Sequence, residues 1–137
     1  MKKHLLLPVC LIFMALFCHA QADYKVVFDL TSKDSIDHKS VIRWLNEITK
    51  ASSDAKVEVV MYGQGTSFAI KGKSFASEDI SRLVSNKNIS FKVCAVALKN
   101  QGVDPSQLLP GIQTTPDGIY EIVLKQRDGW GYIKVKN

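Results

Sequence analysis

The chain has 137 residues, 46% of them hydrophobic and 23% charged, with a formal charge of +5. This length allows one domain with a proper core and excludes two. The basic residues are scattered among apolar ones, which is typical of a solvated surface and argues against a nucleic-acid partner.

The first 22 residues have the three parts of a secretory signal peptide. Lys2–Lys3 give a positive start, Leu5–Phe17 form an apolar stretch, and Ala20–Ala22 match the small-x-small pattern that signal peptidase accepts. We therefore expect cleavage after Ala22, a mature domain over 23–137, and a periplasmic or secreted location with no membrane attachment. A retained anchor is the alternative, although the apolar stretch is short for a bilayer span.

Removal of this segment would leave one cysteine and one histidine, Cys94 and His38, and a formal charge of +3 from 16 basic and 13 acidic side chains. A single thiol excludes an internal disulfide scaffold. In an oxidising compartment, an odd cysteine indicates a buried thiol, a bridge between chains or a reactive sulfur. One histidine and one cysteine also argue against a Cys/His metal centre, so we expect neither a metal nor a cofactor.

The mature part begins with an alternation of strand and helix patterns. Tyr24–Leu30 is rich in β-branched and aromatic residues and predicts a strand. Apolar residues then recur at helical spacing and predict an amphipathic helix over 38–51, with Asp37 as its N-cap. Val57–Tyr62 predicts the second strand.

The middle of the chain continues the same alternation. Ser77 is expected to cap a short helix, because acidic residues follow it in the first turn and suit the helix dipole. Ile89–Val93 predicts the third strand. A helix over 94–101 follows directly, and Gly102 is a natural residue to end it.

The last third of the chain adds two strands and one helix. Ile112–Thr114 predicts a short fourth strand, and Thr115 is expected to cap a helix with Pro116 at its first position. Gly129 ends that helix, and Trp130–Val135 predicts the fifth strand. The alternation argues for a parallel sheet with helices on both faces. The apolar runs fit strands that are buried on two sides.

Cys94 stands where a strand is expected to end and a helix to begin. Ligands of open α/β sheets bind at the carboxyl ends of the strands, and the free amides of a helix N-terminus stabilise a thiolate. A thiolate attacks sulfur electrophiles and can carry an extra sulfur as a persulfide. The alternative is a buried cysteine that acts as a small hydrophobe.

Two other candidates belong to the same edge of the expected sheet. His38 follows the first strand and could pair with Cys94 to activate the thiol; an exposed histidine without a role is the favoured alternative. The backbone amides of Gly63, Gln64 and Gly65 could form an anion-binding nest after the second strand. A plain turn is the favoured alternative there.

The segment Ile89–Val103 resembles the cysteine motif of the DsrE/DsrF-like family of sulfur-relay proteins. In that motif an apolar strand ends in cysteine, a small apolar helix follows, and glycine with a branched residue closes it, as Cys94 and Gly102-Val103 do here. Further matches to exported or uncharacterised members lie downstream at Leu109-Pro110, Pro116–Ile119, Gln126 and Gly129–Ile133.

This resemblance implies a flavodoxin-like three-layer fold with a mostly parallel five-stranded sheet, and assembly into homo-oligomers, either trimers or hexamers. It also implies that Cys94 accepts or passes sulfane sulfur, with a donor or acceptor protein or a small sulfur species as partner. Such a protein acts as a sulfur carrier without a catalytic constellation of the usual kind. The alternative function is a non-enzymatic oligomeric binding or assembly module with a structural cysteine, and the least favoured reading is a Cys94–Cys94 bridge between chains.

Overall fold

Five parallel strands make up the single sheet of the protein. The computed structural model describes residues 23–136, so the expected signal peptide lies outside the described residues. The strand order is β4-β3-β2-β1-β5, and every neighbouring pair is parallel. The strands are β1 (Lys25–Leu30), β2 (Lys56–Met61), β3 (Ile89–Cys94), β4 (Gln113–Thr115) and β5 (Gly131–Val135).

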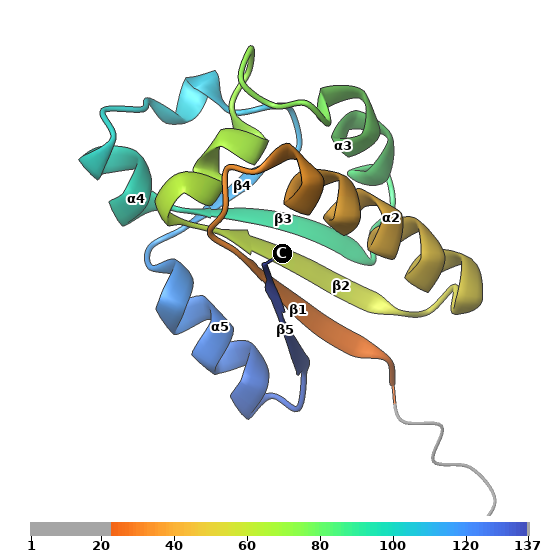
Figure 1. The fold of residues 1–137 in the computed structure, drawn as a ribbon. Helices are drawn as coiled ribbons and strands as arrows, with labels where there is room; N and C mark the ends of the chain where they lie inside the picture. The colour runs from red at the N-terminus through yellow and green to blue at the C-terminus, as the bar shows by residue number, and fades with distance from the viewer. Residues whose placement is uncertain (1–22, 137) are drawn as a thin grey trace, which may run out of the picture.

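Helices cover both faces of this sheet, which confirms the predicted three-layer α/β architecture. Figure 1 shows α2 and α3 on one face and α5 on the other, while α4 and η1 lie beyond the carboxyl ends of the strands. The helices are α2 (Ser35–Ala51), α3 (Ser77–Leu83), α4 (Ala95–Asn100) and α5 (Gly118–Arg127), and the 3-10 helices are η1 (Gly63–Ala69) and η2 (Pro105–Gln107).

The long helices begin at different caps from those predicted. Asp34 caps α2 by accepting a hydrogen bond from the amide of Ile36 at 2.8 Å, and Asp37 is buried in the first turn. Asp117 caps α5, because Thr115 still belongs to β4, where it pairs with β3. Both errors place the cap at an acidic or hydroxyl residue close to the true one.

The start of α3 also differs from the prediction. Its N-cap is Ala76, which makes no side-chain hydrogen bond, and Ser77 lies inside the first turn. The Ser77 hydroxyl instead donates to the backbone carbonyl of Ser74 at 3.1 Å. The helix is therefore preceded by a closed turn and has no side-chain cap.

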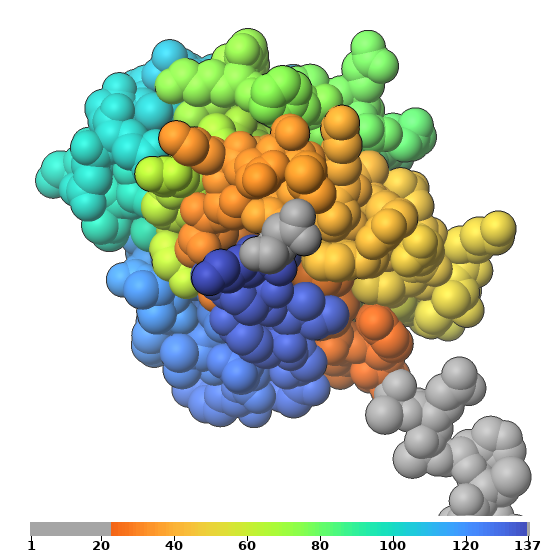
Figure 2. All heavy atoms as spheres, in the orientation of Figure 1, coloured from red at the N-terminus to blue at the C-terminus, as the bar shows by residue number. Residues whose placement is uncertain are grey.

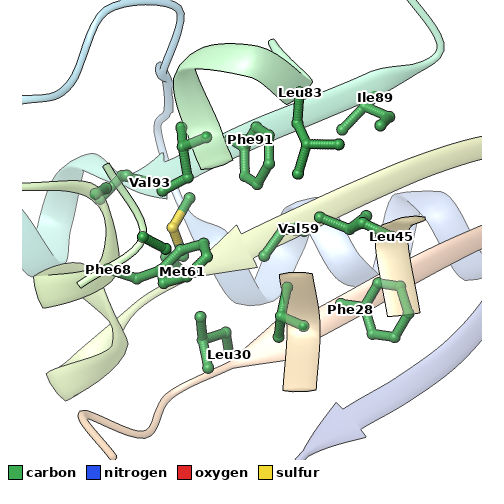
Figure 3. Close-up of a cluster of buried hydrophobic side chains, with 14 of the residues drawn as sticks. Phe28, Leu30, Leu45, Val59, Met61, Phe68, Leu83, Ile89, Phe91 and Val93 are labelled. Atoms are coloured by element: carbon green, nitrogen blue, oxygen red, sulfur yellow. The ribbon is translucent and has the colours of Figure 1, made fainter. Parts of the chain in front are cut away.

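The main hydrophobic core lies between the sheet and the pair of helices α2 and α3. Alternate residues of the three central strands point to this face, as the pleat requires. Full burial of each large apolar side chain contributes roughly 1.5–3 kcal/mol. Figure 3 shows the cluster, with labels on Phe28, Leu30, Leu45, Val59, Met61, Phe68, Leu83, Ile89, Phe91 and Val93.

The opposite face of the sheet is polar and carries only a small apolar cluster. Val27, Val60 and Ile122 form that cluster beneath α5. Between them the strands present charged side chains, among which Asp29 and Glu58 are 4% and 1% exposed. Because buried charges need partners, ion pairs lie on this face of the sheet, whereas the hydrophobic core lies on the other face.

The edge strand β5 lies at the surface. Figure 2 shows it beside α2, with no helix in front of it in that view. Several apolar side chains of α5 and β5 are exposed: Ile119, Tyr120, Val123, Tyr132 and Ile133. Within residues 23–136, no helix has the length and apolar character needed to cross a bilayer.

Candidate functional site

Cys94 is the last residue of β3 and the N-cap of α4, so the predicted junction of strand and helix is confirmed. The preceding Val93 points into the main core, and Cys94 therefore points to the opposite face, toward α5. Its side chain is 6% exposed. The helix α4 ends at Asn100, and Gly102 turns the chain just beyond it.

The start of α4 does not hold the sulfur by a hydrogen bond. As N-cap, Cys94 makes no side-chain hydrogen bond to the helix amides. The helix has six residues, and the field of a helix terminus acts mainly within one turn. Any stabilisation of a thiolate by α4 is thus electrostatic, from one short helix.

Gly118, the first residue of α5, packs directly against the cysteine. A Cβ atom at this position would lie 3.1 Å from the Cβ of Cys94 and 3.3 Å from Cγ1 of Val60. Both distances are shorter than ordinary contacts between methyl groups. The absence of a side chain at residue 118 therefore lets α5 begin beside the sulfur.

An open cavity of about 310 Å³ lies in front of Cys94. It is formed where β2 and β3 end and where α4, α5 and η1 begin, as expected for a parallel sheet. Its lining consists of Tyr62, Gly63, Cys94, Val96, Ala97, Asn100, Gln101, Asp117 and Ile119. Cys94 therefore belongs to the wall of an open cavity with room for a small molecule or a peptide side chain.

Gln101 fixes one wall of this cavity. Its Nε2 donates to the carbonyl of Gly63 at 2.6 Å, and its Oε1 accepts from the hydroxyl of Thr66 at 2.7 Å. These bonds tie the end of α4 to η1. Sequence reasoning missed this residue, because its partners lie more than thirty positions earlier in the chain.

The segment Gly63-Gln64-Gly65 forms the first turn of η1. Gly63 lines the Cys94 cavity, whereas Gly65 is buried and its amide donates to the carbonyl of Tyr62 at 3.0 Å. That amide is therefore occupied, and two amides of the expected nest remain as candidates. The anion-binding role stays a prediction.

Behind the cavity, the buried Asp29 of β1 collects three hydrogen bonds. Its Oδ2 accepts from the hydroxyls of Tyr62 at 3.2 Å and Tyr132 at 2.7 Å. Its Oδ1 accepts from Nζ of Lys134 at 3.0 Å. Since Tyr62 also lines the cavity, this cluster links the edge strand β5 to the Cys94 site.

The two tyrosines of this cluster are held in their neutral form. Burial and the neighbouring Asp29 carboxylate raise the pKa of Tyr62 to about 12. The hydrogen bond to Asp29, together with burial, raises the pKa of Tyr132 to about 12. At neutral pH both hydroxyls therefore donate to the carboxylate.

A second charged cluster lies between the sheet and α5. Glu58 Oε2 accepts from the hydroxyl of Ser90 at 2.8 Å and lies 3.0 Å from Nζ of Lys125. Lys92 lies 2.7 Å from Glu121 and 3.4 Å from Glu58. Burial opposes the charged forms, but the ion pairs win: the pKa of Lys92 is raised and that of Glu121 is lowered.

His38 lies on the other face of the sheet from Cys94. The ring is 1% exposed, so the alternative of an exposed histidine is wrong. Its Nε2 donates to the carbonyl of Ser32 at 2.9 Å, and the ring packs edge-on against Phe68 with centroids 4.8 Å apart. His38 is not among the residues that line the Cys94 cavity.

Comparison with known protein families identifies the chain. The DsrE/DsrF-like family matches residues 25–135, almost all of the described part. The protein belongs to the DsrE/DsrF-like family. Membership implies a function of the sulfur-relay type in general, and it confirms the resemblance carried by the Cys94 segment.

Solved structures support the DsrE-like fold. A protein of unknown function from Methanobacterium thermoautotrophicum, MTH1491, is 29% identical, with a TM-score of 0.77 over 82% of this chain and 99% of that one. The ychN protein from E. coli is 11% identical, with a TM-score of 0.68 over 81% and 98% of the two chains. Protein BT1422 of unknown function from Bacteroides thetaiotaomicron is 14% identical, with a TM-score of 0.64 over 85% and 99%. No curated protein sequence matches the chain.

Proposed function

We propose that this DsrE-like protein is exported and binds or relays sulfane sulfur through Cys94, which carries the sulfur as a persulfide. The observation that carries this proposal is the position of Cys94, at the end of β3 and at the wall of an open cavity. The sulfur-relay character of the family supports the transfer of sulfane sulfur as the reaction at that position.

The transfer needs only one nucleophile from this chain, the thiolate of Cys94. The Cys94 thiolate attacks the outer sulfur of a persulfide donor R–S–SH and forms a new S–S bond. The S–S bond of the donor breaks, and RS⁻ leaves with the electron pair and takes up a proton. An acceptor thiolate then removes the outer sulfur from Cys94 by the same step, so no external oxidant is consumed.

A homo-oligomer, either a trimer or a hexamer, is part of the proposal. The exposed apolar residues of α5 and β5 support it, because apolar and aromatic side chains are enriched in subunit interfaces. A donor or acceptor protein would then meet the cavity of each subunit. The signal-peptide pattern of residues 1–22 supports a periplasmic or secreted location.

One observation favours the alternative of a binding or assembly module with a structural cysteine. At 6% exposure, Cys94 is as buried as many core residues, and free cysteine often acts as a small hydrophobe. In that case the thiol would be unreactive in the folded protein. The two functions therefore differ in a measurable property of one side chain.

The test uses a full chain with Cys10→Ser and Cys18→Ser, in which Cys94 is the remaining thiol. After exposure to a small alkyl persulfide, intact mass should rise by about 32 Da, one sulfur atom. A further Cys94→Ser substitution should abolish the rise. An unchanged mass, with slow native alkylation that becomes fast in denaturant, would instead establish the structural cysteine.

A further inference from the structure

We propose that the Cys94 cavity selects uncharged or cationic sulfur donors over anionic ones, and that Asp117 determines this selectivity. The inference rests on the proposed function and names the donor class for the same site. It predicts the neutral R–S–SH form of small alkyl persulfides and neutral polysulfanes as donors, and it disfavours dianions such as thiosulfate.

The first observation is the charge of the cavity lining. Asp117 is the one carboxylate among the residues that line the cavity, and the lining contains no lysine, arginine or histidine. The apolar walls come from Val96, Ala97 and Ile119, and the polar ones from neutral amides. A donor anion that enters would find no cation to pair with there.

Two lysines, Lys99 and Lys134, lie on neighbouring segments but do not line this cavity. Lys99 of α4 lines a different cavity, together with Ala95 and Leu98. Lys134 approaches the Tyr62 ring at 5.5 Å from its centroid, but its charge is paired with Asp29 at 3.0 Å. Neither Lys99 nor Lys134 is among the residues that line the Cys94 cavity.

The second observation is that the Asp117 carboxylate is fixed in place. As N-cap of α5, its Oδ1 accepts from the amides of Ile119 at 2.8 Å and Tyr120 at 3.0 Å. These two bonds hold the carboxylate at the start of α5. The N-terminus of a helix carries only about half a positive charge, so the full negative charge of Asp117 outweighs that of α5.

The donor reaction can be studied with disulfides, which the thiolate attacks in the same way. Cys94 forms a bond to one sulfur, the original S–S bond breaks, and the second half leaves as a thiolate that takes up a proton. Three probes of equal chain length differ in charge: cystamine is a dication, bis(2-hydroxyethyl) disulfide is neutral, and 3,3′-dithiodipropionate is a dianion. Each adduct has its own mass.

The experiment compares the rates of these probes with Cys94 in the chain that carries Cys10→Ser and Cys18→Ser. Rates are divided by those of a neutral small thiol, N-acetylcysteine amide, to remove intrinsic reactivity. We expect the cation-to-anion rate ratio to exceed that of the small thiol by roughly five- to tenfold, the size of a partly exposed charge interaction. Added salt should reduce this preference.

Asp117→Asn is the decisive variant, because asparagine caps a helix as well as aspartate does and removes the charge. It should bring the ratio close to that of the small thiol. The matched control is Asp104→Asn, which changes the exposed N-cap of η2 outside this cavity and should leave the ratio unchanged.

Two results would overturn the inference in distinguishable ways. If all three probes react with Cys94 but the ratio equals that of the small thiol, or does not respond to salt and Asp117→Asn, the selectivity is wrong and the proposed function stands. If no probe reacts until the chain is denatured, the cavity does not admit donors, and both ideas fail together.

Discussion

Lys92 of β3 and Glu121 of α5 lie 2.7 Å apart and join the helix to the polar face of the sheet. Cys94 follows two positions after Lys92 on the same strand and points to the same face. The ion pair therefore helps to hold α5 over the region that contains the sulfur. The position of α5 beside the cavity should therefore depend on the charges of Lys92 and Glu121.

Glu121→Gln should destabilise the protein at neutral pH and flatten the acid side of its stability profile. The pKa of Glu121 is lowered from its ordinary value of 4.5 in the folded chain. Its contribution is therefore fully present above the unfolded pKa and is lost as the pH falls through the folded one. Because the pair is partly exposed, we expect a loss of only about 1 kcal/mol.

Urea unfolding between about pH 7 and about pH 3 measures this effect. The control is Glu47→Gln, which removes an exposed partner of Arg43 at 3.8 Å and should change the free energy of unfolding very little. Equal losses in the two variants, or an unchanged acid slope in Glu121→Gln, would contradict the assignment.

Gly118→Ala should slow the chemistry of Cys94 and destabilise the fold. The new methyl group would press on Cβ of Cys94 and on Val60, so α5 must shift or the cavity must narrow. Overpacking of this kind typically costs about 1–3 kcal/mol. The measurements are the native alkylation rate of Cys94 and the urea midpoint.

Gly131→Ala provides the matched control for this change. A Cβ atom there would have its nearest neighbour, the carbonyl oxygen of Lys25, at 3.5 Å, an ordinary contact. That variant should keep the alkylation rate. A Gly118→Ala protein that alkylates at the parent rate would show that the close approach of α5 does not shape the site.

Asp29→Asn should lower the pKa of two tyrosines from about 12 toward their ordinary value of 10. The carboxylate disfavours phenolate at both Tyr62 and Tyr132, and asparagine carries no charge. Because both values are raised in the fold, the tyrosines contribute stability below pH 10 that is lost as the pH rises through 12. Ultraviolet absorbance of phenolate against pH gives the titration directly.

The chain contains four tyrosines. In the parent titration, two of them, Tyr62 and Tyr132, should ionise late, near pH 12. In Tyr62→Phe one late group should remain and one should disappear. If Asp29→Asn leaves both late groups in place, the hydrogen bonds to Asp29 are not what keeps the hydroxyls protonated.

His38→Gln should leave the dependence of Cys94 alkylation on pH unchanged. The His38 ring packs against Phe68 on the far side of the sheet and does not line the cavity. The amide of glutamine can still donate to the carbonyl of Ser32, so the chain should fold. A pH profile that shifts in this variant would establish the Cys–His pairing that the sequence suggests.

Local patterns were sufficient to predict the fold and the place of Cys94. The apolar runs gave all five strands within one or two residues, and the strand that ends at Cys94 continues directly into a helix. Parallel pairing then follows from the alternation of strands and helices. The order of strands in the sheet depends on contacts between distant segments and could not be derived from the same patterns.

The polar clusters show where sequence reasoning stops. Asp29 accepts from Tyr132 and Lys134, more than a hundred positions away, and no local spacing predicts such a contact. A signal existed, because an aspartate within an otherwise apolar strand must find partners when buried. Thr115 is the cap that the sequence predicts for α5, and the role of Asp117 as the actual cap depends on the extension of β4 through Thr115.

The uneven composition of the two faces has a consequence for motion. α5 buries only Gly118 and Ile122, whereas α2 contributes Val41 and Leu45 to the large core. Ion pairs therefore contribute more to the attachment of α5 than hydrophobic packing does. Amide protons of α5 should accordingly exchange with deuterium sooner than those of α2, and high ionic strength should widen the difference. Cys94 would then lie beneath a helix that opens more readily than α2 does.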